Sequence, residues 1–173
     1  GISDFIICTG YKADVIRNYF INFRSTYSDF TVSYASGGSI DFHDELDETS
    51  WKVTVADTGS LTMTGGRIKA VEKYLEGERF LATYGDGIAD VDLTELLSSH
   101  ESSGAVATLS TTRPNSRFGV VQSDQQGLVT EFLEKPQGSE VINIGYFIME
   151  PGIFEYLDQD SILEEEPLRR LAA

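Results

Sequence analysis

The sequence predicts an α/β fold with a mixed, mostly parallel sheet flanked by helices. Short apolar runs at residues 5–8 and 80–84 have the pattern of strands that are covered on both faces. Between such runs lie segments whose apolar residues recur at helical spacing. Strands that alternate with helices usually form mostly parallel sheets, and a hairpin predicted at 120–134 makes this sheet mixed.

The elements follow in chain order from these patterns. Helices are expected at 12–23 and 67–75. A third helix is expected after Asp92, which with Glu95 resembles a capping box, and a short helix is expected to begin at Pro151. Residues 36–50 predict a loop or short hairpin, and the Gly-, Ser- and Thr-rich residues 58–66 predict a loop. No linker or repeat interrupts the chain, so residues 1–173 are expected to form a single domain. Strands are expected at 5–8, 31–34, 51–56, 80–84, 105–110, 120–123, 128–134 and 141–149.

The composition is that of a globular protein and excludes several partners. The chain has 173 residues, of which 40% are hydrophobic and 24% charged. A net charge of −15 disfavours nucleic acid and anionic membranes as partners, whereas small anionic substrates remain compatible with a locally positive site. No apolar run reaches the roughly 18 residues of a membrane span, and no leader pattern opens the chain. We therefore expect a cytoplasmic protein.

The few cysteine and histidine residues give little sign of a metal centre. Cys8 is the only cysteine and lies in an apolar run, where it is expected to be a small buried hydrophobe. His43 and His100 lie far apart in the sequence, and each is expected to be an exposed residue rather than a ligand or a base.

The first candidate site is Asp86, which follows the strand at 80–84 and stands between Gly85 and Gly87. Ligands of α/β sheets bind at the carboxyl ends of strands. A carboxylate there can hold Mg²⁺, which commonly takes one or two carboxylates together with substrate phosphates. The alternative interpretation is a plain Asp-Gly turn between a strand and a helix.

The second candidate is the segment 62–67, Thr-Met-Thr-Gly-Gly-Arg, before a predicted helix. Free N–H groups at a helix start and the Arg67 guanidinium suit a phosphate or a base edge, with Thr62 nearby. The alternative is that Thr64 caps the helix and that Arg67 is solvated.

The third candidate is Glu134 with Lys135, before a proline. Lys135 could neutralise a phosphate and Glu134 could accept sugar hydroxyls, or the two could be an ordinary exposed charged pair. Gly119 is a weaker signal, because it could either admit a ligand or shape the start of a strand.

The order of these segments carries more information than any one of them. Asp-Thr-Gly at 57–59, the segment 62–67, Tyr-Gly-Asp-Gly at 84–87, Phe-Gly at 118–119, Glu-Lys-Pro at 134–136 and Asn-Ile-Gly-Tyr at 143–146 occur in succession. This order resembles the sugar-phosphate nucleotidyltransferases, and most closely the glucose-1-phosphate cytidylyltransferase family. The resemblance covers essentially the whole chain and implies a Rossmann-like nucleotidyltransferase fold, truncated at both ends.

The resemblance also implies an activity, a cofactor and a set of site residues. The implied reaction joins CTP and α-D-glucose 1-phosphate to give CDP-glucose and pyrophosphate, with Mg²⁺ as the cofactor. Asp86 would hold the metal, and Asp86 and Lys135 would be catalytic. The nucleotide would be bound by Thr62, Arg67 and Gly85, and the sugar phosphate by Gly119, Glu134, Lys135, Asn143 and Gly145.

The sequence departs from the family pattern in two places. A Gly-rich loop with Gly-Thr-Arg and Lys-Pro, and a Met-Asp-Thr segment with a second carboxylate, have no match in residues 1–173. We therefore expect this chain to be the central part of a homo-oligomeric enzyme, inactive and poorly soluble by itself. Three alternatives stay open: another nucleotide such as UTP or dTTP, a non-catalytic sugar-nucleotide-binding subunit, and a glycosyltransferase. The last is disfavoured because those enzymes usually present Asp-x-Asp, whereas Gly87 and Ile88 follow Asp86.

Overall fold

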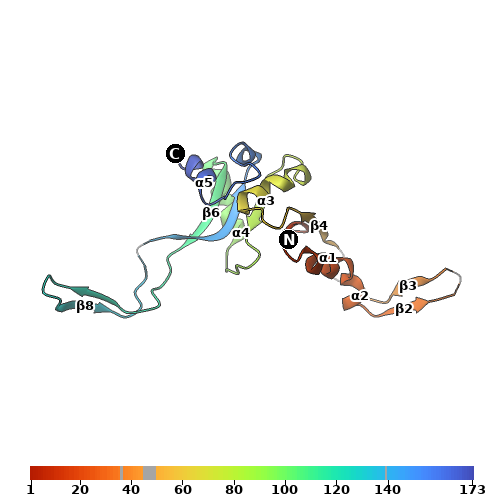
Figure 1. Cartoon of the computed structure of the whole chain (residues 1–173), viewed down its shortest axis with the longest axis horizontal. Coiled ribbons are helices and arrows are strands. Elements are labelled where there is room, and N and C mark those ends of the chain that lie inside the picture. The colour runs from red at the N-terminus through yellow and green to blue at the C-terminus, as the bar shows by residue number, and fades with distance from the viewer. Residues whose placement is uncertain (36, 45–49, 139) are drawn as a thin grey trace. The chain divides into compact units, whose positions relative to one another are not determined.

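The computed structural model describes residues 1–35, 37–44, 50–138 and 140–173, and Figure 1 colours the chain by residue number. The chain divides into two compact units, Gly1–Gly77 with Phe154–Ala173 and Glu78–Ile153. The first unit is thus made of two stretches that are separate in the sequence, and the second unit lies between them in the sequence. Whether residues 1–173 form one domain stays a prediction, because this division does not show whether either unit folds alone.

A parallel strand pair forms the sheet of the first unit. β1 (Asp4–Thr9) pairs in parallel with β4 (Lys52–Asp57), and Phe5 lies opposite Val53. Helix α1 (Ala13–Ile21) packs against β4, and α3 (Thr64–Val71) packs against β1. The α/β class is confirmed, and parallel pairing is confirmed for these two strands.

The segment predicted as one helix at 12–23 forms two helices. Asn22 ends α1 and begins α2 (Phe23–Tyr27), and its carbonyl oxygen accepts from the side chains of Ser25 and Thr26. The antiparallel hairpin of β2 (Phe30–Ser33) and β3 (Ser39–Phe42) follows. Its first strand confirms the strand expected at 31–34, and its second strand lies within 36–50, where a loop or short hairpin was expected. Residues 36 and 45–49 of that prediction lie outside the described residues.

Helix α3 begins three residues earlier than the sequence predicts. Thr64, Gly65 and Gly66 were expected in a loop but are helical, and a 3₁₀ turn, η2 (Glu72–Tyr74), completes the helix. Both glycines are buried against residues 159–161, so tertiary packing overrides the poor helix propensity of glycine. Residues 159–161 belong to the second stretch of the first unit, Phe154–Ala173, which is called the closing segment below. The closing segment also contains α5 (Glu166–Leu171) and the buried Leu163.

The second unit is built on an antiparallel sheet of three strands. Strand β9 (Ile142–Met149) lies between β5 (Phe80–Thr83) and β6 (Ala107–Thr112) and runs opposite to both. The expected mostly parallel sheet is therefore corrected, since every described strand pairing other than β1 with β4 is antiparallel. The cause is that β9 returns between two earlier strands after a hairpin has reversed the chain.

One helix and the end of β9 form the core of this unit. Helix α4 (Leu93–Ser103) packs against β6 and β9, and the Asp92 carboxylate caps it as predicted, accepting from the N–H groups of Thr94 (2.8 Å) and Glu95 (3.0 Å). The core side chains are Leu96, Phe147, Ile148, Met149 and Ile153, and the last lies in the 3₁₀ helix η3 (Pro151–Glu155).

The predicted hairpin at 120–134 is confirmed. Strands β7 (Val120–Ser123) and β8 (Val129–Leu133) pair antiparallel, and every residue of both strands is exposed. The Asp124 carboxylate shapes the turn by accepting from the N–H groups of Gln126 and Leu128.

His100 corrects one expectation. The side chain was expected to be exposed but is only 1% exposed, because α4 turns this residue towards the sheet. Its Nδ1 lies 2.8 Å from Thr108 Oγ1, and its Nε2 lies 3.1 Å from Glu150 Oε1, which also accepts from Arg79 Nε. The Arg79 guanidinium first, and then His100, hold the pKa of Glu150 below its usual value. His43 is exposed, as predicted.

Cys8 is half-buried, so its expected full burial is only partly met. Burial raises the pKa of its thiol, and the nearby positive charge of Arg67 partly opposes this effect. Across the described ranges, the helices are too short or too polar to cross a lipid bilayer.

Candidate active site

The loop after β5 presents Asp86 to solvent. Within the described part of the chain, its carboxylate takes part in no hydrogen bond or ion pair. A Cβ atom built on Gly85 or on Gly87 would meet nothing within 4 Å, so the space on both sides of Asp86 is open. The loop therefore offers an unpaired carboxylate that a ligand can approach closely.

Strand β9 holds the backbone of this loop. The Tyr146 hydroxyl donates to the carbonyl oxygen of Gly87 (3.3 Å) and accepts from the N–H of Ala89 (3.2 Å). Tyr146 lies opposite Thr83 in the sheet, next to the point where β5 ends. The residues that follow Asp86 are thus fastened to the neighbouring strand.

A bulge in β9 brings Asn143 and Gly145 to the same loop. The pairing register between β6 and β9 shifts at this place, and Gly145 has a φ of +82°. A Cβ on Gly145 would overlap the ring of Tyr84, and the Asn143 side-chain amide lies 3.4 Å from the Tyr84 hydroxyl. The structure therefore places Asn143 and Gly145 against Tyr84, two positions before Asp86.

Gly119, Glu134 and Lys135 gather at the base of the β7–β8 hairpin. A Cβ on Gly119 would lie 2.5 Å from the Phe132 ring and 3.2 Å from Glu134 Oε2, so this glycine permits close packing. Glu134 Oε1 lies 3.8 Å from Lys135 Nζ, and the two side chains are 64% and 63% exposed. Lys135 has a φ of +46°, which is uncommon for a residue other than glycine.

Arg67 is held in place within the first unit. Its Nη1 donates to Thr58 Oγ1 (2.7 Å), and the Thr58 hydroxyl donates in turn to the carbonyl oxygen of Thr9 (2.9 Å). A Cβ on Gly10 would lie 2.8 Å from Arg67 Nη2, so the guanidinium rests directly against the Gly10 backbone. The side chain is therefore positioned by two loops, instead of being solvated.

Thr62 belongs to a tightly built loop between β4 and α3. Gly59 has a φ of +95°, and a Cβ there would lie 2.6 Å from Thr62 Oγ1. The Asp57 carboxylate accepts from the Gly59 N–H and pairs with Arg17 at 3.1 Å. The Arg17 guanidinium first, and then this N–H, hold the pKa of Asp57 below its usual value.

The start of α3 is hydrogen-bonded to the closing segment of the chain. The Gly66 N–H donates to the Ser161 carbonyl oxygen (3.0 Å), and Thr64 Oγ1 donates to Glu164 and accepts from the Leu163 N–H. The alternative interpretation, in which Thr64 caps the helix, is corrected, because Met63 is the N-cap residue, with no side-chain cap bond. The closing segment of the chain uses the polar groups that seemed free in the sequence.

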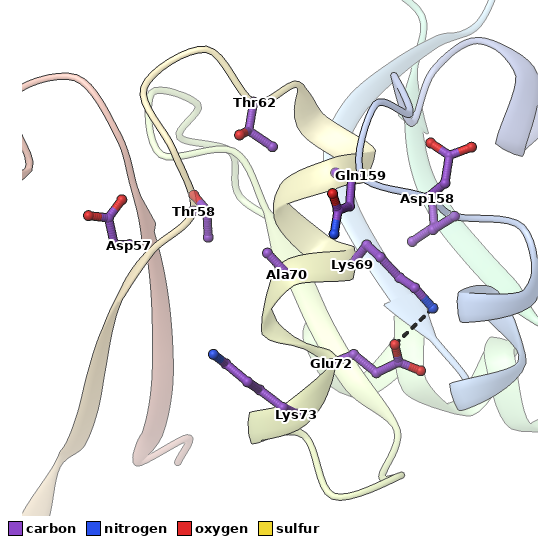
Figure 2. Close-up of a pocket in the computed structure, with 11 residues that line it drawn as sticks. Asp57, Thr58, Thr62, Lys69, Ala70, Glu72, Lys73, Asp158 and Gln159 are labelled. Atoms are coloured by element: carbon purple, nitrogen blue, oxygen red, sulfur yellow. Dashed lines mark ion pairs between the residues drawn. The ribbon is translucent and has the colours of Figure 1, made fainter.

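A pocket of about 630 Å³ lies in the first unit, within the size range of small-molecule sites. The loop after β4, helix α3 and residues 157–159 line it, and Thr62 is one of its walls (Figure 2). Lys69 pairs with Glu72 at 2.8 Å at one side, as Figure 2 shows. Asp57, Lys73 and Asp158 add charges of both signs, so the lining does not select an anion.

The predicted metal site gains limited support. Across the described residues, no three His, Cys, Asp or Glu side chains gather as a metal cluster. Asp86 nevertheless fits the single carboxylate that Mg²⁺ takes when substrate phosphates supply further ligands. Exposed and unpaired, it could bind such an ion without giving up another interaction.

Three contributors to the site were missed in the sequence. Gly10 seats the Arg67 guanidinium, Thr58 orients it, and Tyr146 fastens the Asp86 loop. The Asp-Thr-Gly motif at 57–59 contained a signal for Thr58, and the Asn-Ile-Gly-Tyr segment at 143–146 contained Tyr146, although no role was predicted for it.

Comparison with known proteins places the chain in a family. Residues 25–169 match the model of the family described as nucleotidyl transferase. A Salmonella typhi protein named glucose-1-phosphate cytidylyltransferase is 43% identical over 175 residues, which cover 99% of this chain and 67% of the relative. A Synechocystis protein named UTP–glucose-1-phosphate uridylyltransferase is 33% identical over 109 residues, covering 57% of this chain and 28% of that protein.

A solved structure agrees on the fold. The crystal structure of HddC from Yersinia pseudotuberculosis has a TM-score of 0.65 and 23% identity, covering 98% of this chain and 66% of that one. This chain therefore spans about two thirds of the length of the Salmonella relative and of HddC. The family match, the identity and the shared fold agree, and the chain belongs to the nucleotidyl transferase family, whose members similar to it include enzymes named glucose-1-phosphate cytidylyltransferase.

Proposed function

We propose that the protein carrying this chain transfers the cytidylyl group of CTP to α-D-glucose 1-phosphate, releasing pyrophosphate and forming CDP-glucose. The observation that carries the proposal is the 43% identity to the Salmonella typhi glucose-1-phosphate cytidylyltransferase across 99% of the chain. The open Asp86 loop and the bulge of β9 beside it support the proposal, because a ligand can approach the backbone there.

In the proposed reaction, an oxygen of the sugar phosphate attacks the α-phosphorus of CTP. The bond between that phosphorus and the oxygen bridging to the β-phosphate breaks, and pyrophosphate leaves with the electron pair. Little covalent chemistry falls to the protein, which must align two anions and reduce their repulsion. Mg²⁺, when bound, screens the phosphate charges, and Asp86 is the side chain proposed to hold it.

Five further residues are proposed to bind the sugar phosphate. Lys135 is proposed to bind the sugar phosphate and Glu134 the sugar hydroxyls, and the two lie together at the hairpin base. Asn143, Gly145 and Gly119 are proposed to line the sugar pocket. The first two lie beside Tyr84, and the third lies against Glu134.

The nucleotide is proposed to contact Gly85, Thr62 and Arg67. The glycine is open on its side-chain face, so a nucleotide can approach the backbone. Arg67 is pre-oriented by Thr58, which lowers the entropy lost when a guanidinium binds an anion or a base edge.

Two other functions have support of their own. The Synechocystis relative bears a name that specifies UTP, which favours a nucleotidyltransferase using UTP or dTTP as the second candidate. A non-catalytic subunit that binds sugar nucleotides is the third, because the Gly-rich loop of the family pattern has no match in residues 1–173. A cytoplasmic location and a homo-oligomeric full-length protein belong to the leading proposal, and sedimentation velocity tests the assembly.

The decisive assay compares nucleotides in a completed enzyme. In a chimaera, this chain replaces the matching two thirds of the Salmonella relative, and pyrophosphate release is measured with glucose 1-phosphate, Mg²⁺ and CTP, UTP or dTTP. Turnover fastest with CTP supports the proposal, and turnover fastest with UTP or dTTP selects the second candidate. Binding of CDP-glucose without turnover selects the third. Asp86→Asn is the inactive control, and the 173-residue chain alone is expected to show negligible turnover.

A further inference from the structure

Asp86 depends on its own backbone for its position. No side chain of the described residues hydrogen-bonds to its carboxylate, and the glycines on either side leave the local backbone few steric restraints. An unsupported carboxylate on such a loop would sample many orientations. Something else must restrict the loop if Asp86 is to hold a ligand at a fixed place.

The Tyr146 hydroxyl supplies two restraints just after Asp86. A phenol can donate one hydrogen bond and accept another, and here it uses both on the loop backbone. It donates to the Gly87 carbonyl oxygen at 3.3 Å and accepts from the Ala89 N–H at 3.2 Å. The two bonds span the stretch that immediately follows Asp86 and join it to a single point on β9.

That point on β9 is itself well fixed. The next residue, Phe147, is only 1% exposed, and Tyr146 pairs with Thr83 at the end of β5. On the other side, the bulge at Gly145 presses against the ring of Tyr84, and the Gly145 N–H donates to the Asn143 side chain at 2.8 Å. Because Tyr146 is held in the sheet, hydrogen bonds from its hydroxyl can restrict the motion of the loop.

We propose that Tyr146 is a positioning residue for the metal-binding loop, which sets the Asp86 carboxylate for a divalent cation without touching the cation itself. This inference rests on the proposed function, because it gives Asp86 the metal. It gives a role to a residue for which the sequence predicted none, and it assigns that role to the hydroxyl group and not to the aromatic ring.

The test measures the restraint of the loop by the Tyr146 hydroxyl (the clamp) separately from the binding of the cation by Asp86. Tyr146→Phe keeps the ring and removes only the hydroxyl, and Tyr34→Phe, at a side chain that is 92% exposed, is the matched control. In the full chain, the exchange rate of the Ala89 amide is measured by NMR. Mn²⁺ is the probe for the cation, and its paramagnetic broadening of the amides of the 85–89 loop gives the dissociation constant.

Tyr146→Phe is expected to speed exchange at Ala89 by about 2- to 10-fold, the factor for one lost hydrogen bond. It is expected to weaken Mn²⁺ binding by about 10-fold, as when a residue that orients a metal ligand is lost. Tyr34→Phe should change neither quantity, and Asp86→Asn should abolish the broadening.

Two results would overturn the inference. Exchange at Ala89 that is unchanged in Tyr146→Phe would show that the hydroxyl does not restrain the loop. Faster exchange with unchanged Mn²⁺ affinity would show that the restraint does not position Asp86. A wild-type chain that leaves the loop amides sharp at millimolar Mn²⁺ contradicts the metal role in the proposed function instead, and exchange at Ala89 then decides the clamp alone.

Discussion

Gly66 gives the sharpest test of how the first unit is built. It lies in helix α3, where replacing glycine by alanine normally stabilises a protein by about 1 kcal/mol through helix propensity. The structure predicts the opposite sign. A Cβ on Gly66 would overlap the carbonyl oxygen of Gln159 and would lie 2.9 Å from the Thr62 methyl group.

The magnitude follows from three contributions. Displacing residues 159–161 lengthens or breaks the hydrogen bond from the Gly66 N–H to Ser161, which is 3.0 Å long and contributes about 1 kcal/mol. Forcing extra atoms into a packed contact costs about 1–3 kcal/mol. After the propensity gain of about 1 kcal/mol is subtracted, Gly66→Ala should destabilise the protein by about 1–3 kcal/mol.

Urea unfolding followed by tryptophan fluorescence measures this change. Trp51 is the only tryptophan of the chain and belongs to the same unit as Gly66, where its ring meets Phe5 at 5.5 Å. Gly152→Ala is the control, since a Cβ there would meet Val106 at an ordinary 3.6 Å. Equal or higher stability of Gly66→Ala would refute the claim that this glycine is required by packing.

Three further changes test other parts of the structure. Arg67→Lys cannot reproduce the fixed guanidinium contact with Thr58, so it should weaken CTP binding about 10-fold in titration calorimetry. Thr58→Ser keeps the hydroxyl and should bind CTP as wild type does. Equal CTP affinities of Arg67→Lys and wild type would contradict the role of this pair. The depressed pKa of Glu150 means that its stabilising effect is present above its ordinary value of 4.5 and is lost as the pH falls through the lower, folded-state value. The urea midpoint of wild type should therefore fall more between pH 6 and pH 3 than that of Glu150→Gln, and parallel profiles would count against the network around this carboxylate. Asp92→Ala removes the cap of α4 and should lower the free energy of unfolding by about 1 kcal/mol, and an unchanged urea midpoint would show that the cap contributes nothing.

Local elements could be predicted from the sequence because they depend on neighbouring residues. The apolar run that became β1, the Asp92 cap and the β7–β8 hairpin are examples. Strand direction could not, because the apolar pattern of β9 does not say which strands it will join. His100 was misjudged for the same reason, since its serine and glutamate neighbours suggest a surface helix, while its partners lie outside the helix, Thr108 in β6 and Glu150 just after β9.

Some residues of the candidate site could be predicted from the sequence, and others could not. Asp86 could be found because a strand end with flanking glycines is a local pattern, and Asn143 and Gly145 were found through the family resemblance. Tyr146 ends the Asn-Ile-Gly-Tyr segment, but its role could not be predicted, because its hydrogen bonds to Gly87 and Ala89 join residues that lie 59 and 57 positions apart in the chain. No pattern of neighbouring residues records a contact over such a separation.

The return of the closing segment to the first unit has a consequence for how the protein is made. Thr64 bonds to Glu164, 100 residues later in the chain, so the surface that receives the closing segment is synthesised long before that segment. At roughly 5–20 residues per second, a ribosome needs on the order of ten seconds to cover that distance. During this interval the face of α3 that later packs against residues 159–161 is uncovered on the nascent chain. Protection of that face by a chaperone would therefore matter more during translation than after it.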